Sequence, residues 1–152
     1  MVNVTLPDGT INEYAAGVTA GEVVIDALGK KHGCLAARID DVERDLSTEL
    51  TADCNLEGIL ADSDAGMYIL RHSTAHLLAQ AVLELYPDAK PTIGPPIDRG
   101  FYYDFAMEPI GESDLKPIEK KMHEIARRNL KMERIELDEQ DLRNHFTSNP
   151  YK

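Results

Sequence analysis

The sequence predicts an α+β chain in two parts, residues 1–61 and 62–152. In the first part a hairpin is followed by one helix and further strands, which is the order of a small mixed sheet. The second part begins where capping residues precede a long helical stretch. A length of 152 residues and a hydrophobic content of 43% allow one ordinary domain or two small ones, folded without disulfides.

Residues 2–14 are predicted to form the hairpin, because "VNVTL" and "TINEY" flank the turn sequence "PDG". Thr19 and Glu22 have the spacing of a capping box at the start of a helix that ends near Gly29 or Gly33. The segments "CLAARID" and "LEGIL" are predicted strands, and "VERDLS" between them is a short strand or a turn. This order is typical of the β-grasp (ubiquitin-like) fold.

In the second part, residues 62–64 are predicted to cap a helix that continues to Tyr86 and stops at the following proline. Prolines and glycines bound the apolar runs of "KPTIGPPIDRGFYYDFAM", which predicts two strands joined by a loop around residues 98–100. We then expect a helix capped by Asp114 and ending roughly at Lys131, a strand at "MERIELD", and the start of another helix at "EQDLRNHF".

The charge is strongly acidic and unevenly distributed. A formal net charge of -11 argues against a protein whose whole surface binds a phosphate backbone. Residues 1–62 carry 12 acidic and 4 basic side chains, whereas residues 63–152 carry 15 and 12. One predicted helix of the second part and its end hold a basic cluster: Lys116, Lys120, Lys121, Arg127, Arg128, Lys131 and Arg134. This cluster is the candidate nucleic-acid interface, and the alternative is a solvated basic face without a ligand.

The cysteines and the hydropathy of the sequence indicate the cellular compartment of the protein. Cys34 and Cys54 form no CxxC pair, and the amino terminus has neither the basic nor the apolar region of a signal peptide. No window approaches the run of about 20 apolar residues that spans a bilayer. We therefore expect a reduced, cytoplasmic protein with no membrane partner.

The stretch "RHSTAHLLAQAV" places His72 and His76 one helical turn apart on the same face. A zincin would have Glu after the first histidine, and Ser73 stands there instead. A metal site needs a further ligand, and no other histidine has a signature spacing with the pair. A structural pair on a packed stripe near Ile69 and Leu83 is the third possibility.

Three motifs in succession resemble a known family. "RHSTAHLLAQAV", then "IGPPIDRGFYYDF", then "LKPIEKKMHEIARRNL" resemble the editing domain of bacterial threonyl-tRNA synthetases, which contains an HxxxH element. Gly94, Ile97 and residues 100–104 match the phrase that favours the threonine enzyme. Residues 1–61 independently resemble the TGS domain that precedes the editing domain there. Together the two resemblances cover essentially the whole chain.

The resemblance implies an amino-terminal fragment, with a TGS-like domain at 1–61 and a truncated editing domain at 62–152. The family pairs the HxxxH histidines with a later CxxxH element, which is absent from this sequence, and Cys34 and Cys54 precede the histidines. The family also uses a lysine that Lys152 matches weakly. By resemblance, the full-length enzyme uses ATP, magnesium and zinc and is a homodimer, whereas the fragment needs no cofactor, is monomeric and lacks the aminoacylation core.

The resemblance also implies the chemistry, because threonine and serine differ by one methyl group. Such a difference supports roughly 10 to 200-fold discrimination, so a second pocket that hydrolyses mischarged seryl-tRNA improves accuracy. Imidazoles suit this reaction because they position or deprotonate water near neutral pH. His72 and His76 would therefore position water and contact the terminal ribose or ester.

Other residues are candidates for binding the tRNA(Thr) acceptor end. Tyr102 and Tyr103 could pack against the terminal adenine, although a regular strand turns at most one of them toward the site. With Asp104 they form the predicted substrate-binding set, and the basic helix would approach the tRNA through phosphates. The alternative function is a stand-alone binding or regulatory module without catalysis. A complete trans-editing deacylase is disfavoured because the CxxxH element is absent.

Overall fold

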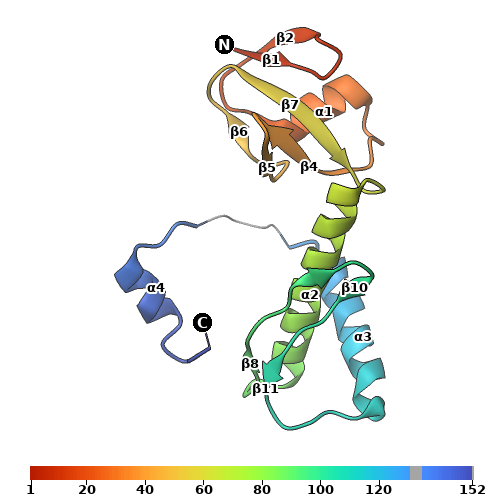
Figure 1. Cartoon of the computed structure of the whole chain (residues 1–152), viewed down its shortest axis with the longest axis vertical. Helices are drawn as coiled ribbons and strands as arrows, with labels where there is room; N and C mark the ends of the chain where they lie inside the picture. Colours follow the sequence, from red (N-terminus) through yellow and green to blue (C-terminus); the bar gives the residue numbers. More distant parts are fainter. Residues whose placement is uncertain (131–134, 152) are drawn as a thin grey trace. The chain divides into compact units, whose positions relative to one another are not determined.

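The structure is a computed structural model, and it describes residues 1–130 and 135–151. It has mixed helices and strands, so the predicted α+β class is confirmed. The chain divides into two compact units, residues 1–70 and 71–152, which are described separately below (Figure 1). The predicted boundary at residue 62 was placed by sequence alone and stays a prediction.

Unit 1 is built around a five-stranded sheet in the order β2-β1-β7-β4-β5. Its neighbours are antiparallel except β1 and β7, which run parallel. The strands are β1 (Val2–Thr5), β2 (Ile11–Tyr14), β4 (Cys34–Ile39), β5 (Val42–Arg44) and β7 (Cys54–Leu60). The helix α1 (Ala20–Leu28) contacts β4 and β7 (Figure 1). These are the hairpin, helix and strands that the sequence predicts for a β-grasp domain.

Local sequence explains the elements of unit 1. Alternation in β1 buries Val2 and Val4 and leaves the residue between them exposed. Thr19 accepts a hydrogen bond from the backbone of Glu22, whose carboxylate accepts one from the backbone of Thr19, so the predicted capping box is confirmed. Gly29 ends α1 at a φ of 83°.

Two short strands of unit 1 were not predicted. β3 (Val18–Thr19) pairs with β6 (Glu49–Leu50) in a separate antiparallel pair. Each is only two residues long, so neither has an alternating pattern that periodicity could detect. The pair brings Leu50, which is 3% exposed, into the core that α1 and the large sheet share.

The helix α2 (Asp64–Leu85) begins in unit 1 and continues into unit 2. Ser63 accepts a hydrogen bond from the backbone N–H of Gly66 at 3.1 Å and so caps the first turn. A Cβ on Gly66 would lie 1.9 Å from the carbonyl oxygen of Leu60, so only glycine fits this close approach to the end of β7. The predicted helix is confirmed within the usual uncertainty of its ends.

Unit 2 contains the rest of α2, a long hairpin and two further helices. The hairpin is made of β8 (Lys90–Pro91) paired with β11 (Phe105–Ala106), and β9 (Pro96–Ile97) paired with β10 (Gly100–Phe101). The two helices are α3 (Glu112–Arg127) and α4 (Glu139–His145). The predicted pair of strands joined by a loop near residues 98–100 is therefore confirmed.

Two predictions for unit 2 need correction. α3 is capped at Gly111 and not at Asp114, because the Asp114 carboxylate accepts a hydrogen bond from the Gly111 N–H at 2.8 Å, one turn back. The predicted strand "MERIELD" falls partly outside the described residues. Its described part, residues 135–138, forms no strand and leads into the N-cap Asp138.

The core of unit 2 lies between α2, α3 and the hairpin. Its buried residues are Ala81, Val82, Ala89, Ile118 and Ile125. Tyr86 donates a hydrogen bond to Asp114 at 3.1 Å, which joins the end of α2 to the start of α3. Asn149, 9% exposed, donates to the carbonyl of Pro91 at 2.9 Å and so attaches the segment after α4 to the hairpin.

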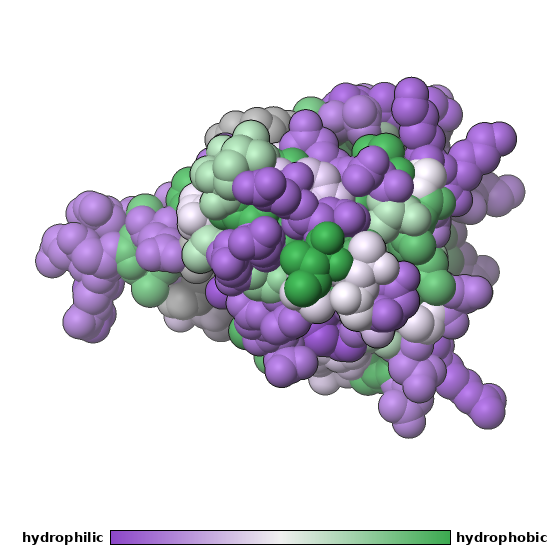
Figure 2. Space-filling model, turned by 90° about the horizontal axis from the view of Figure 1, so that it is seen from above, coloured by the Kyte–Doolittle hydropathy of each residue, from purple (hydrophilic) through white to green (hydrophobic). Residues whose placement is uncertain are grey.

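Hydrophilic residues dominate the face that Figure 2 shows, and hydrophobic residues form small separate groups on it. Among the described residues, no helix is long and apolar enough to cross a bilayer.

Candidate functional site

The histidine pair lies on the exposed side of α2. The rings of His72 and His76 stack with centroids 4.8 Å apart and an angle of 25° between their planes. Both side chains are exposed, whereas Ala75, between them in sequence, is completely buried. The helical spacing therefore brings the two imidazoles together, as the sequence predicts.

The chemistry open to this pair is that of two neighbouring nitrogen donors and acceptors in contact with solvent. Each imidazole can hold a water or an ester oxygen by a hydrogen bond. A closed zinc site needs three or four ligands. No group of three His, Cys, Asp or Glu side chains that could hold a metal ion occurs among residues 1–130 and 135–151. The zinc that the resemblance implies is expected for the full-length enzyme and not for this part of it.

The two tyrosines of the hairpin differ in burial and in ring contacts. Tyr103 is half-buried, stacks on Phe105 with centroids 4.8 Å apart, and leaves no room for a side chain at Gly94, whose added Cβ would lie 2.1 Å from the ring. Tyr102 is 47% exposed. Among the described residues, no ring contact joins Tyr102 to the histidine pair. Of the two tyrosines, Tyr102 is the one available to stack on a base.

Asp104 lies between β10 and β11, where its backbone continues the hydrogen bonding of the hairpin. Its backbone N–H donates to Ile93 at 2.9 Å, and its carbonyl accepts from the backbone and hydroxyl of Thr92 at 3.0 and 2.9 Å. Its side chain is exposed. The backbone thus fixes the position of this predicted substrate-binding residue, while the carboxylate faces solvent.

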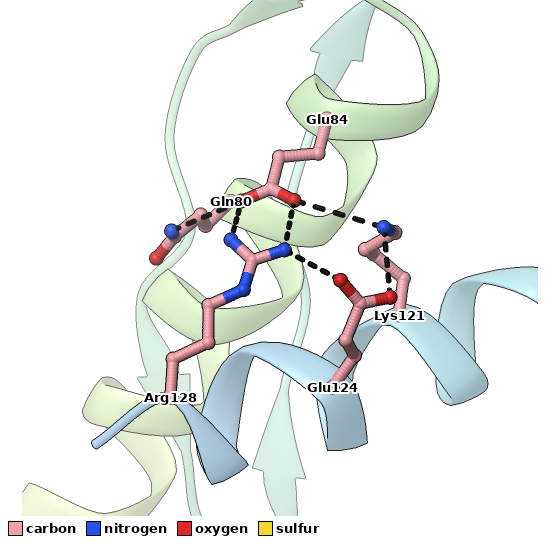
Figure 3. A network of polar contacts seen from close by, with 5 residues as sticks. All are labelled: Gln80, Glu84, Lys121, Glu124 and Arg128. Carbon is pink, nitrogen blue, oxygen red and sulfur yellow. Dashed lines mark hydrogen bonds and ion pairs between the residues drawn. The ribbon is translucent and has the colours of Figure 1, made fainter. Parts of the chain in front are cut away.

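Two basic residues of the candidate interface belong to an ion-pair network between α2 and α3 (Figure 3). Arg128 donates to both carboxylate oxygens of Glu84 at 2.7 and 2.8 Å and to Glu124 at 2.7 Å. Lys121 lies 2.9 Å from Glu124 and 3.8 Å from Glu84. Arg128 and Lys121 lower the pKa of Glu124 to about 2, and the hydrogen bond from Arg128 lowers the pKa of Glu84.

The remaining basic residues of α3 form a separate surface, called here the basic stripe. Lys116, Lys120, His123 and Arg127 follow each other at helical spacing and line one shallow hollow with Glu119. None of the three cations, Lys116, Lys120 and Arg127, makes an ion pair with a residue that the structure describes. Their charge is therefore offset only by Glu119 within the hollow.

Two predicted site residues, Lys131 and Lys152, lie outside the described residues, as does Arg134. Sequence reasoning missed His123 as a member of the basic stripe, although the spacing 116, 120, 123, 127 would have indicated it. It also missed the two glutamates that neutralise Lys121 and Arg128. Glu124 could have been found from its spacing of four residues from Arg128, whereas Glu84 lies on another helix.

Comparison with known proteins found close relatives, although no family model matches the chain. The threonine–tRNA ligase of Rubrobacter xylanophilus is 45% identical over 155 residues, covering 100% of this chain and 24% of the relative. That of Thermoplasma acidophilum is 44% identical over 147 residues, covering 97% and 21%. That of Francisella tularensis is 47% identical over 133 residues, covering 85% and 21%.

These relatives are aminoacyl-tRNA ligases, the class of protein that the histidine spacing and the hairpin motif resemble. Within that class the chain is similar to threonine–tRNA ligases over 85–100% of its length, as a fragment of such an enzyme would be. The chain spans about a quarter of the length of the curated relatives it matches. The resemblance drawn from the sequence motifs is confirmed, while the roles of individual residues stay predictions.

Proposed function

We propose that this chain contributes to tRNA binding and to hydrolytic editing of mischarged seryl-tRNA(Thr) within a threonine–tRNA ligase. The stacked, exposed imidazoles of His72 and His76 carry the proposal. Hydrolysis requires a water and an ester carbonyl held together, and two adjacent imidazoles supply hydrogen bonds to both. One histidine positions the water, and the other contacts the terminal ribose or ester.

The hairpin and α3 would hold the tRNA around this chemistry. Tyr102 is exposed and offers a ring face on which the terminal adenine stacks. The basic stripe supplies cations for the phosphates of the acceptor stem, because its Lys and Arg side chains are not engaged by described carboxylates. Lys121 and Arg128 contribute less, since Glu84 and Glu124 already neutralise them.

Editing is tested in a ligase that contains this sequence, by measuring deacylation of seryl-tRNA(Thr) and activation of threonine separately. His72→Ala and His76→Ala should each slow deacylation, by about 10²- to 10⁴-fold if the histidine acts in proton transfer. Threonine activation should stay near its normal rate. His145→Ala, which removes an exposed histidine on α4, is the matched control and should leave both reactions unchanged. Equal deacylation per folded molecule in all three variants would make the pair structural.

The tRNA contact is tested by the salt dependence of binding. Lys116→Ala, Lys120→Ala and Arg127→Ala should each weaken binding and reduce the slope of log affinity against log salt by about one. Lys121→Ala, on the same helix, is the control and should change the slope less because its charge is paired. An equal change at Lys121 would assign the contact to the whole helix and not to the basic stripe.

The alternative function, a binding or regulatory module without catalysis, is supported by one observation. The sequence contains no CxxxH element, which the family pairs with the HxxxH histidines. The chain by itself should therefore hydrolyse seryl-tRNA weakly or not at all, although it retains the basic stripe. A continuing reading frame that encodes CxxxH and a synthetase core would favour editing, and a natural stop would favour the binding module.

A further inference from the structure

Unit 1 contains an apolar groove that the proposed function does not use. The groove encloses about 340 Å³ between the turn after β1, the helix α1 and the strand β7. Val24 and Leu56 form its floor and are 1% and 2% exposed, whereas Leu28 and Leu60 on its walls are 57% and 44% exposed. Gly58 has no side chain to fill the space. An exposed apolar hollow of this kind typically marks an interaction site.

An acidic hollow adjoins the groove. It encloses about 480 Å³ and shares Leu6, Pro7, Leu56 and Glu57 with the apolar groove, so the two hollows meet along these residues. Its carboxylates come from Asp40, Asp41 and Glu57, and Asp8 lines the apolar groove. The whole region of residues 1–62 carries 12 acidic and 4 basic side chains.

The carboxylates differ in the hydrogen bonds and ion pairs that they already make within the chain. Glu57 pairs with Arg38 at 2.7 Å, and Asp40 accepts from the backbone of Asn55 at 2.8 Å. Asp41 makes no hydrogen bond or ion pair with a residue that the structure describes. Asp8 accepts a hydrogen bond from the backbone N–H of Thr10, two residues on, at 2.9 Å. Arg38, which also lines the acidic hollow, pairs with Glu57 and with Glu43 at 3.6 Å, so Asp8 and Asp41 make no ion pair with a residue that the structure describes.

We propose that these joined hollows dock a peptide segment of a partner protein in which apolar side chains alternate with Lys or Arg. The apolar side chain enters the groove over Val24 and Leu56, and the neighbouring basic side chain reaches the acidic hollow. Charge complementarity selects this occupant, because an RNA or an acidic segment meets the repulsion of the surrounding carboxylates. The volume lies at the lower end of the roughly 300–1,000 Å³ typical of ligand pockets, enough for one or two side chains.

The proposal is tested by titrating the isotope-labelled chain with three five-residue peptide probes and following backbone amide shifts. The probes are Lys-Leu-Arg-Leu-Lys, its acidic counterpart Glu-Leu-Glu-Leu-Glu, and Lys-Ser-Arg-Ser-Lys, which lacks apolar side chains. The first probe should shift amides of the turn after β1, of α1 and of β7. The other two should bind at least about tenfold more weakly, since each satisfies only half of the site.

Two variants and their controls keep the test specific. Leu28→Gln with Leu60→Gln should weaken the first probe at least about tenfold, whereas Ile11→Gln, which changes a 64% exposed residue outside the groove, should not. Asp8→Asn with Asp41→Asn should weaken it by a smaller factor that vanishes at high salt, while Glu13→Gln with Glu49→Gln should have little effect. Equal binding of the three probes, shifts elsewhere, or no shifts at all would overturn the proposal.

Discussion

The two units of the chain reach stability in different ways. In unit 1 a sheet and one helix close around nine buried residues, of which two are alanines and six are larger aliphatic residues: Val2, Val4, Val23, Val24, Leu50 and Leu56. In unit 2 the five buried core residues include two alanines, and a charged network fastens α3 to α2 beside them. Unit 1 therefore has the larger buried apolar core, while in unit 2 partly exposed ion pairs between the helices add a small contribution to a smaller one.

The difference matters for function because α2 is both a core element and the bearer of the histidines. Its buried side holds Ala75 and Ala79, which are 0% and 7% exposed, while His72 and His76 lie on its exposed side. Glu84 on the same helix binds Arg128 of the segment after α3. Contacts that fix α2 in unit 2 thus also fix the orientation of His72 and His76.

The largest effect we expect is that unit 1 folds when it is separated from unit 2. Residues 1–61 should retain slowly exchanging amides in β1, β4 and β7, because their core residues all lie within this segment. Residues 1–70, the division that the contacts give, should be protected to the same degree or slightly more. Hydrogen exchange on both segments is the measurement. Exchange as fast as in an unfolded chain throughout would abolish the distinction between the units.

The second largest effect should come from shortening a buried side chain in either core. Leu56→Ala in unit 1 and Ile118→Ala in unit 2 remove buried side chains that are 2% and 5% exposed. Each should reduce stability by about 2–5 kcal/mol. Because the units have separate cores, hydrogen exchange should accelerate only in the unit that carries the substitution. Equal acceleration in both would mean that the chain unfolds as one cooperative body.

Sequence reasoning predicted local features of both units well. The hairpin at residues 2–14, the Thr19 capping box and the stacked histidines depend on neighbours within a few positions. Features that depend on distant partners escaped it. The pairing of β3 with β6 joins residues about 30 apart in two-residue strands, and Glu84 lies 44 positions from Arg128.

The candidate interface shows the same limit. The sequence assigns seven basic residues of α3 and its end to tRNA binding together, because they carry the same charge and lie close in sequence. The fold divides them, since Lys121 and Arg128 turn toward carboxylates and the basic stripe does not. Only the partners across the helix pair distinguish the two groups, and those partners depend on how α3 packs.

Two glycines at close approaches provide the third test. Gly66→Ala places a Cβ 1.9 Å from a backbone oxygen of Leu60, and Gly94→Ala places one 2.1 Å from the ring of Tyr103. Each should reduce stability by about 1–3 kcal/mol through overpacking. Adding Tyr103→Ala should relieve much of the effect at Gly94, because that obstacle is a side chain. No side-chain truncation should relieve Gly66→Ala, and a rescue there would contradict the backbone contact.

The smallest effect should come from the charged network, and its sign depends on pH. Interaction with Arg128 and Lys121 lowers the pKa of Glu124 from 4.5 to about 2, so the carboxylate stabilises the folded state above pH 4.5 and loses this contribution as the pH falls toward 2. Glu124→Gln should lower the unfolding temperature of unit 2 at neutral pH by roughly 2–4 °C. The difference from the original chain should shrink between pH 4.5 and 2. Glu119→Gln, on the same helix and in no ion pair with a described residue, is the control and should show no such dependence. A pH-independent difference for Glu124→Gln would show that its side chain acts by packing, and unit 2 would then resemble unit 1 more closely than its charges indicate.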